Sequence, residues 1–164
     1  MTGTSSISGT IADNNSSGIN LFNGLVTINS AGAWDFSGNS SCELRGGLTH
    51  NGLSFTSGNG TYTMTANNQE INGTSPITLN GDLIIASNIS VTNKNSSSGT
   101  GVTIIGNLNG LNLNSTFINQ GITSYGSSVV PMNLGVLDAS FNGNTFIYSG
   151  STQSISVDNN YYNL

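Results

Sequence analysis

The sequence contains very little charge. Only two of its 164 residues are basic, Arg45 and Lys94, and seven are acidic, so charged residues make up 5% of the chain. An average soluble domain has roughly a quarter of its residues charged. A nucleic-acid-binding surface needs clustered Lys and Arg to displace the counterions of the phosphates. Two basic residues cannot form such a patch, so we expect no nucleic-acid partner.

The sequence also lacks the patterns of helical and membrane-spanning proteins. The strong helix formers Ala, Glu, Lys, Leu and Arg are scarce. No window of about 11 residues keeps apolar residues at positions i, i+3, i+4 and i+7 without an interrupting Gly or Asn. No apolar run approaches the roughly 18 to 20 residues of a membrane span. We therefore predict little or no α-helix and no membrane span.

Cysteine and targeting signals are equally sparse. The single cysteine, Cys42, excludes an internal disulfide framework, and its alternation with Leu44 predicts a buried, inert thiol. Met1 is followed by neither a basic segment nor an apolar segment of the kind that targeting signals contain. We expect residues 1–164 to form a single domain, or an excerpt of a longer repeat protein. The polar, uncharged composition is typical of extracellular and cell-surface proteins.

Four small or polar residue types dominate the chain. Asn occurs 26 times, Ser 26, Gly 22 and Thr 18, which is 92 of the 164 residues. Disordered chains share this bias, but they have less than roughly 20% Leu, Ile, Val and Phe. Here these four types number 41, or 25%, and the net charge of −5 gives little self-repulsion. The composition therefore predicts a folded chain.

The apolar residues fall in short alternating clusters separated by Gly, Asn and Ser. A period of two with β-branched and aromatic residues predicts strands that bury one face. About fifteen strands spaced every 8 to 12 residues fit either a parallel β-helix (β-solenoid) or a β-sandwich. The predicted strands are Leu25–Ile28, Ala33–Phe36, Cys42–Arg45, Leu53–Thr56, Thr61–Thr65, Ile77–Leu79, Asp82–Ile85, Ile89–Thr92, Val102–Ile105, Leu111–Leu113, Thr116–Ile118, Val136–Ala139, Thr145–Tyr148 and Ser154–Val157, with Ser5–Ile7 and Tyr161–Leu164 near the ends.

An internal repeat favours the solenoid over the sandwich. Residues 61–71 match residues 145–155 at a constant offset of 84, with Gln69 aligned to Gln153 and Ile71 to Ile155. This offset would suit about four coils of roughly 21 residues, because coils that contact only their neighbours tolerate drifted repeats. We therefore predict an all-β, right-handed parallel β-helix, with the β-sandwich as the alternative.

The same residues resemble a family. Residues 143–155, followed by Asn160-Tyr161-Tyr162-Asn163-Leu164, resemble the repeats of large Bacteroidota surface proteins, in which "T-V-x-Y-S-G", "Q-x-I" and "Y-Y-N-L" recur. Residues 58–83 are similar to a second, looser copy, and residues 34–39 and 135–139 suit the pattern. The resemblance covers roughly half of the chain. It implies a right-handed parallel β-helix in an adhesin stalk or extracellular fibre, and it supplies no catalytic or binding residues.

The carboxylates give little support to an enzyme. No two of the seven lie within six residues of one another, and most alternate with apolar neighbours, which is typical of a solvated outer face. A glycan-binding or polysaccharide-cleaving module is the alternative, and it would need acidic and aromatic residues of successive coils in one groove. Its candidate residues are Asp35, Glu43, Glu70, Asp82 and Trp34.

The remaining residue types suggest no site. His50 is the only histidine, and one histidine with one cysteine cannot make a zinc site. We expect His50 on the surface or in a turn. Thr61, Thr63 and Thr65 could begin an ice-binding array, which is a minor alternative because residues 145–149 do not repeat the threonines. We therefore assign no catalytic, cofactor-binding or metal-binding residue and predict that the protein is not an enzyme.

The expected function is structural. A solenoid has open ends that expose unpaired backbone groups, and no charged or helical cap is visible in the sequence. We predict an extracellular bacterial protein, a module of a surface filament or adhesin stalk, which associates end to end through residues near Ser5, Ile7, Tyr161 and Leu164. Surface glycans are the second class of expected partner.

Overall fold

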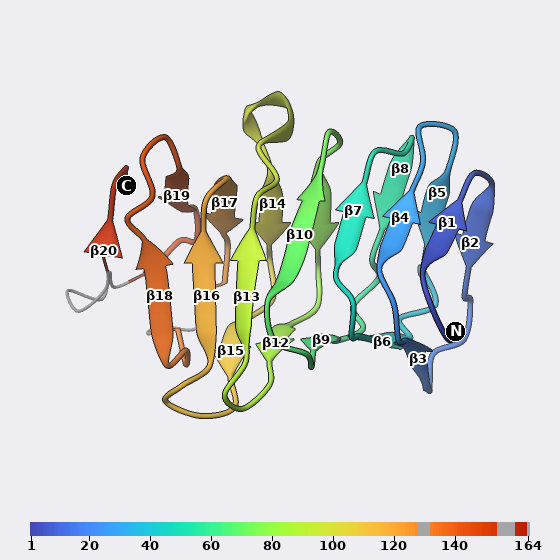
Figure 1. Cartoon of the computed structure of the whole chain (residues 1–164), viewed down its shortest axis with the longest axis horizontal. Helices are drawn as coiled ribbons and strands as arrows, with labels where there is room; N and C mark the ends of the chain where they lie inside the picture. Colours follow the sequence, from blue (N-terminus) through green and yellow to red (C-terminus); the bar gives the residue numbers. More distant parts are fainter. Residues whose placement is uncertain (128–131, 154–159, 164) are drawn as a thin grey trace.

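The chain coils into a β-solenoid whose strands all run parallel to their neighbours. The structure, a computed structural model, describes residues 1–127, 132–153 and 160–163, without the side chain of Ser98. The chain rises along the front sheet, crosses over the top to the sheet behind, and advances from right to left, so the coil is right-handed (Figure 1). The predicted fold class is confirmed, and the sandwich alternative is excluded because each strand pairs with the strand one coil away.

The first face is one continuous sheet along the whole described solenoid. It has one strand per coil, and its eight strands define seven successive turns. In order along the axis these strands are β1 (Ser5–Ile7), β4 (Val26–Ile28), β7 (Leu48–His50), β10 (Gln69–Gly73), β13 (Ser90–Asn93), β16 (Thr116–Asn119), β18 (Val136–Ala139) and β20 (Asn160–Tyr161).

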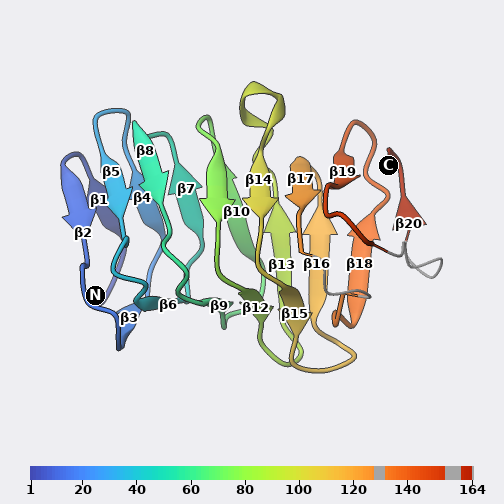
Figure 2. The ribbon, with the colours of Figure 1, turned by 180° about the vertical axis from the view of Figure 1, so that it is seen from behind.

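The second and third faces complete each coil (Figure 2). The second face is divided into a sheet of β2 (Thr10–Ala12), β5 (Ala33–Asp35) and β8 (Ser54–Thr56), and a sheet of β11 (Ile77–Leu79), β14 (Val102–Ile104), β17 (Ile122–Tyr125) and β19 (Thr145–Tyr148). The third face contains β3 (Ile19–Phe22), β6 (Ser41–Leu44), β9 (Tyr62–Met64), β12 (Leu83–Ile85) and β15 (Leu108–Gly110).

The coils differ in length. Register partners on the first face are 20 residues apart between Thr116 and Val136, and 26 apart between Ser90 and Thr116. The longest coil contains the described portion's only helix, the 3₁₀ turn Ser97–Gly99. Because of this variation, the offset of 84 is not a whole number of coils. It carries β9 on the third face to β19 on the second, so the prediction of four equal coils was wrong.

The internal repeat nevertheless marks the same local structure twice. Gln69 accepts a hydrogen bond from the backbone N–H of Ala66 and donates to the carbonyl of Leu44 at 2.7 Å. Gln153 accepts from Gly150 N–H and donates to the carbonyl of Tyr125 at 2.8 Å. Leu44 and Tyr125 are the register partners of aligned strand residues on β9 and β19. The repeat is therefore a strand followed by a glutamine-capped corner.

The core is built from inward columns of alternating residues, and its N-terminal half is aromatic. Trp34 is fully buried, stacks on Phe36 at 4.2 Å and on Phe55 at 5.6 Å, and donates from Nε1 to the hydroxyl of Tyr62 at 2.9 Å. Cys42 packs into the same core, and burial raises the pKa of its thiol to about 12. The predicted burial of Cys42 is confirmed.

The C-terminal half of the core contains a ladder of buried asparagines. The Nδ2 of Asn93 donates to Oδ1 of Asn119 at 3.0 Å, and the Nδ2 of Asn119 donates to Oδ1 of Asn144 at 3.3 Å. Thr123 donates to Asn119 Oδ1 at 2.8 Å. All four side chains are fully buried. A buried amide is stable only if its donors and acceptors are paired. Asn93 and Asn119 each donate to the next coil, and the Nδ2 of Asn144 donates to the carbonyls of Ala139 and Phe141 in its own coil.

One predicted strand is a corner. Leu111–Leu113 lies just after β15, and Leu111 and Leu113 are 60% and 86% exposed. The N–H of Asn112 donates to Ser115 Oγ, and the N–H of Ser115 donates back to Asn112 O. Asn112 and Ser115 therefore bond to each other in a local turn, where a strand residue would bond to the neighbouring coil. The predicted strand Ser154–Val157 lies outside the described residues.

Candidate functional site: the two ends of the solenoid

The first face ends in an edge strand, β1, that has one bonded side. Ser5 N–H donates to the carbonyl of Leu25, and Asn29 N–H donates to the carbonyl of Ile7, both at 2.8 Å. Ser5 and Ile7 therefore direct their backbone groups toward β4. Because successive residues of a strand direct these groups to opposite sides, the N–H and C=O of Ser6 point away from the solenoid.

The second face ends in the same way at β2. Asp13 N–H donates to the carbonyl of Asp35 at 2.9 Å, and Ala33 N–H donates to the carbonyl of Gly9 at 3.0 Å. Residues 9 and 13 therefore face β5. The backbone groups of Thr10 and Ala12 point to the open side, beside those of Ser6.

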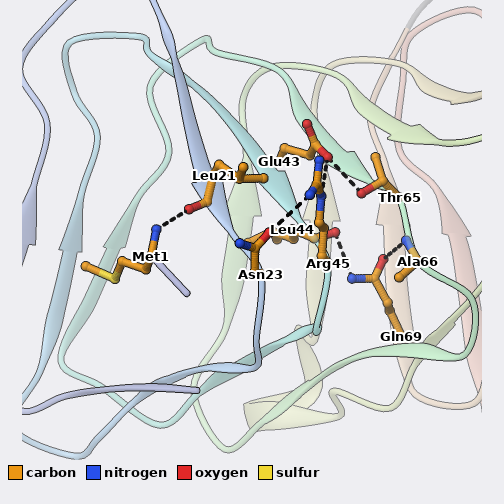
Figure 3. A network of polar contacts seen from close by, with 9 residues as sticks. All are labelled: Met1, Leu21, Asn23, Glu43, Leu44, Arg45, Thr65, Ala66 and Gln69. Atoms are coloured by element: carbon orange, nitrogen blue, oxygen red, sulfur yellow. Dashed lines mark hydrogen bonds and ion pairs between the residues drawn. The ribbon is translucent and has the colours of Figure 1, made fainter. Parts of the chain in front are cut away.

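The third face differs because its edge strand is covered. The amino group of Met1 donates to the carbonyl of Leu21 at 2.6 Å, and Asn23 N–H donates to the carbonyl of Met1 at 3.0 Å. Figure 3 shows the contact between Met1 and Leu21. Met1 thus occupies the place that a neighbouring strand would take beside β3.

Between these three edges the core opens into a hollow, which we call the mouth. Its volume is about 350 Å³. Phe22 and Phe36 are buried at its wall, whereas Ile19 is 70% exposed at its rim. The hollow has a mixed lining, and its apolar side chains gain free energy when another apolar surface covers them. The mouth is lined by Met1, Ile11, Ala12, Ile19, Asn20, Leu21, Phe22 and Phe36.

The opposite end presents β20, which pairs with β18 on one side. Tyr162 N–H donates to the carbonyl of Ala139 at 2.7 Å, and Tyr161 is the register partner of Ala139. The rings of Phe146, Tyr148 and Tyr161 lie together at this end, and the hydroxyls of Tyr148 and Tyr161 are hydrogen-bonded. Leu164, which we predicted to take part in association, lies outside the described residues.

Both basic side chains are paired with carboxylates, Arg45 in the second coil and Lys94 in the fifth. Arg45 Nε lies 2.7 Å from Glu43 Oε1 on the third face, where Glu43 also accepts from Thr65 (Figure 3). Lys94 pairs with Glu70 on the first face. Both pairs are well exposed to solvent and contribute little to stability.

One acidic side chain lies close to the mouth. Asp13 accepts hydrogen bonds from Asn20 Nδ2 at 2.6 Å and from the N–H of Asn15 at 2.9 Å. The Asn20 amide, followed by the Asn15 backbone, lowers the pKa of Asp13 to about 2. Asp13 is therefore ionised at neutral pH, and Asn20 connects it to the lining of the mouth.

The residues required for a glycan-processing groove are separated. Asp35 lies on the second face, Glu43 on the third and Glu70 on the first. Asp82 precedes β12 and accepts from Asn107 N–H at 2.8 Å, while Trp34 is fully buried and cannot stack on a sugar. Residues 1–127, 132–153 and 160–163 contain no group of three or more His, Cys, Asp or Glu able to hold a metal ion.

The threonines of β9 do not extend into an array. On the third face the register partners of Thr63 are Glu43 and Ile84. An ion-paired carboxylate and an aliphatic side chain therefore flank the threonine strand. The geometry offers no observation that favours ice binding at this position.

The position predicted for His50 was wrong. His50 is 1% exposed and ends β7 inside the core, where its ring lies 5.4 Å from that of Phe55. The alternation Leu48-Thr49-His50 was the available signal, because it places His50 on the same inward side as Leu48. A lone polar residue in a short run was insufficient to reveal the strand.

No family model matches the chain, and neither a curated protein nor a solved structure matches it. Within the described portion, there is no helix with the length and apolar character needed to cross a membrane. The candidate functional surfaces are the two ends of the solenoid, and they are identified from the geometry of the structure.

Proposed function

We propose that this protein is a structural module of an extracellular bacterial fibre or adhesin stalk, in which solenoids associate end to end. The observation that carries this proposal is the open backbone edge of β1 at the start of the first face. Ser6 directs its N–H and C=O outward from β1, and β20 is the last strand at the other end of the same sheet within the described residues. An open parallel edge such as that of β1 is a template for another strand.

The proposed junction follows from the direction of the strands. All strands of the first face are parallel, so β20 of one copy would lie beside β1 of the next in the same orientation. The first sheet would then continue from copy to copy at the usual strand spacing of about 4.8 Å. The mouth would face the aromatic end of the neighbouring copy, where the side chain of Tyr162 is 52% exposed.

The charge distribution is compatible with such stacking. Arg45 and Lys94 are each paired with a carboxylate, so neither places an unpaired positive charge against the neighbouring copy. The low charge and the resemblance of residues 143–155 to Bacteroidota surface repeats support the extracellular and bacterial parts of the proposal.

Proline substitution at the open edge tests the proposal. The variant Ser6→Pro with Ala12→Pro removes two N–H donors that point away from the solenoid, and edge positions of this kind tolerate proline. We expect the unmodified protein to sediment as multimers whose size increases with concentration, and the double proline variant to remain monomeric with an unchanged circular dichroism spectrum.

The matched control is Ser6→Ala with Ala12→Ser, which retains both backbone donors and should assemble like the unmodified protein. The proposal is contradicted if the unmodified protein is a monomer at every concentration. It is equally contradicted if the proline variant folds and assembles as well as the control.

A further inference from the structure

The second face contains a break that the other two faces lack. β8 and β11 lie next to each other in consecutive coils, yet they belong to different sheets because no backbone ladder joins them. Pro76 immediately precedes β11. Proline has no N–H, so it cannot donate to a ladder at this point. We call the contact between β8 and β11 the seam.

Side chains replace part of the missing ladder at the seam. Asn80 N–H donates to Ser57 Oγ at 2.9 Å, and Thr74 N–H donates to Asn51 Oδ1 at 2.9 Å. The Thr74 hydroxyl also donates to Asn51 Oδ1, at 3.1 Å. One backbone bond also crosses this corner, from the N–H of Ser75 to the carbonyl of His50 at 3.0 Å. The other bonds that hold the two coils together on this side depend on side-chain conformation.

His50 lies in the core next to Asn51, the acceptor for Thr74. Its Nδ1 accepts a hydrogen bond from Gly52 N–H at 3.3 Å, across the corner that contains Asn51. The ring packs against Phe55 of β8 at 5.4 Å. An Nδ1 that accepts a hydrogen bond carries no proton, so His50 is neutral in this structure.

The surroundings of His50 offer no compensation for a positive charge. Its register partners on the first face are Ile28 on β4 and Gly73 on β10, and Phe55 contacts it from β8. None of these three side chains is titratable or charged. Burial is the physical cause that lowers the pKa of His50 below its usual value of 6.5.

We propose that protonation of His50 opens the seam, so that mild acid loosens the junction between β8 and β11. A proton on Nδ1 places an N–H against the N–H of Gly52, and the hydrogen bond between them is lost. The corner then releases Asn51, and with it the acceptor that holds Thr74. This inference concerns a junction inside one chain and is independent of the association of the ends.

The direction of the pH effect follows from linkage. Because the pKa of His50 is lower in the closed seam than in the open one, the closed state is fully stable above pH 6.5 and loses stability as the pH falls below that value. At pH 5.5, one unit below the ordinary pKa, protonation can increase the population of the open seam by up to about tenfold.

Hydrogen exchange measured by mass spectrometry tests this proposal on the intact chain. We expect peptides covering residues 50–57 and 74–80 to exchange up to about tenfold faster at pH 5.5 than at pH 7.5, after correction for the intrinsic pH dependence of exchange. Peptides covering residues 102–125, where β14 and β17 share a full ladder, should show no such increase.

Two variants separate the proposed cause from general acid sensitivity. His50→Asn places an amide oxygen near the position of Nδ1 and does not titrate, so its seam should exchange equally at both pH values. Asn51→Ala removes the acceptor for Thr74, so its seam should already exchange faster at pH 7.5. The proposal is overturned if the unmodified seam is insensitive to pH, or if His50→Asn retains the full acid response.

Discussion

The two halves of the solenoid fill the same cross-section with different chemistry. Along one inward column of the first face, the residues are Val26, Leu48 and Ile71 in the early coils, and Asn93 and Asn119 in the later ones. The backbone register does not change between them. A parallel coil therefore specifies where a side chain points, but it does not require that side chain to be apolar.

The comparison shows that the two halves depend on different interactions. In the early half, the rings of Phe22, Phe36 and Phe55 surround Trp34, and the apolar contact between these rings stabilises the core. Asn119 in the later half depends on Asn93 in the preceding coil and on Asn144 and the carbonyl of Thr145 in the following coil. Apolar packing has many small contributions, whereas each rung of an amide ladder has few alternatives.

The largest effect is expected in the aromatic half. Trp34→Ala removes a fully buried indole, leaves a cavity among three rings, and should lower the free energy of unfolding by about 3–5 kcal/mol. Urea denaturation followed by circular dichroism measures this. Ser54→Ala on the neighbouring strand, where the side chain is exposed, is the control and should change the stability little. A loss for Trp34→Ala no larger than that of the control would refute the central role of the aromatic cluster.

A smaller loss is expected in the asparagine ladder. Asn119→Ala removes the acceptor of the buried Thr123 hydroxyl and the donor to the carbonyl of Thr145, and should cost about 2–3 kcal/mol because these polar groups lose their partner. Gln120→Ala, one residue along the chain, is the matched control. Equal stabilities of the two variants in urea denaturation would show that the ladder contributes nothing specific.

The glutamine corners should behave alike in both halves. Gln69→Leu and Gln153→Leu each remove one acceptor and one donor to the preceding coil, and each should cost about 1–2 kcal/mol. Thermal unfolding of both variants measures these losses of stability, with Gln120→Leu as the control. A large loss at one corner with none at the other would mean that the repeated sequence does not mark a repeated function.

The smallest expected effect concerns acid stability near the mouth. Because hydrogen bonding to Asn20 lowers the pKa of Asp13 from 3.8 to about 2, its contribution is present above pH 3.8 and is lost as the pH falls toward 2. Asp13→Asn and Asn20→Ala should both flatten the decrease of the urea midpoint over this range. An unaltered pH profile in both variants would argue against the Asp13–Asn20 contact.

The sequence predicted many of the strands whose inward residues are apolar. Alternation around Cys42 and Tyr62 was sufficient, because each lies between outward polar residues. It missed β3 and β15, where a single inward apolar residue, Phe22 or Leu108, stands beside Asn and Gly. It also missed β7, because His50 is a polar residue on the inward side of a three-residue strand.

The ends were predicted only in part. The strand at Ser5–Ile7 is present, and its open side follows from the parallel register. The mouth and the cover that Met1 provides for β3 could not be predicted, since they depend on how three faces meet at the end of the solenoid. Leu111–Leu113 shows the opposite error, because an alternating run satisfied its hydrogen bonds within a local turn.

The most direct test of end-to-end association is an image of the native assembly at a resolution that separates strands. We predict copies stacked along the solenoid axis, with β20 of one copy beside β1 of the next and strand spacing of about 4.8 Å unbroken across each junction. Isolated monomers, or copies associated side by side with their ends free, would contradict the proposal.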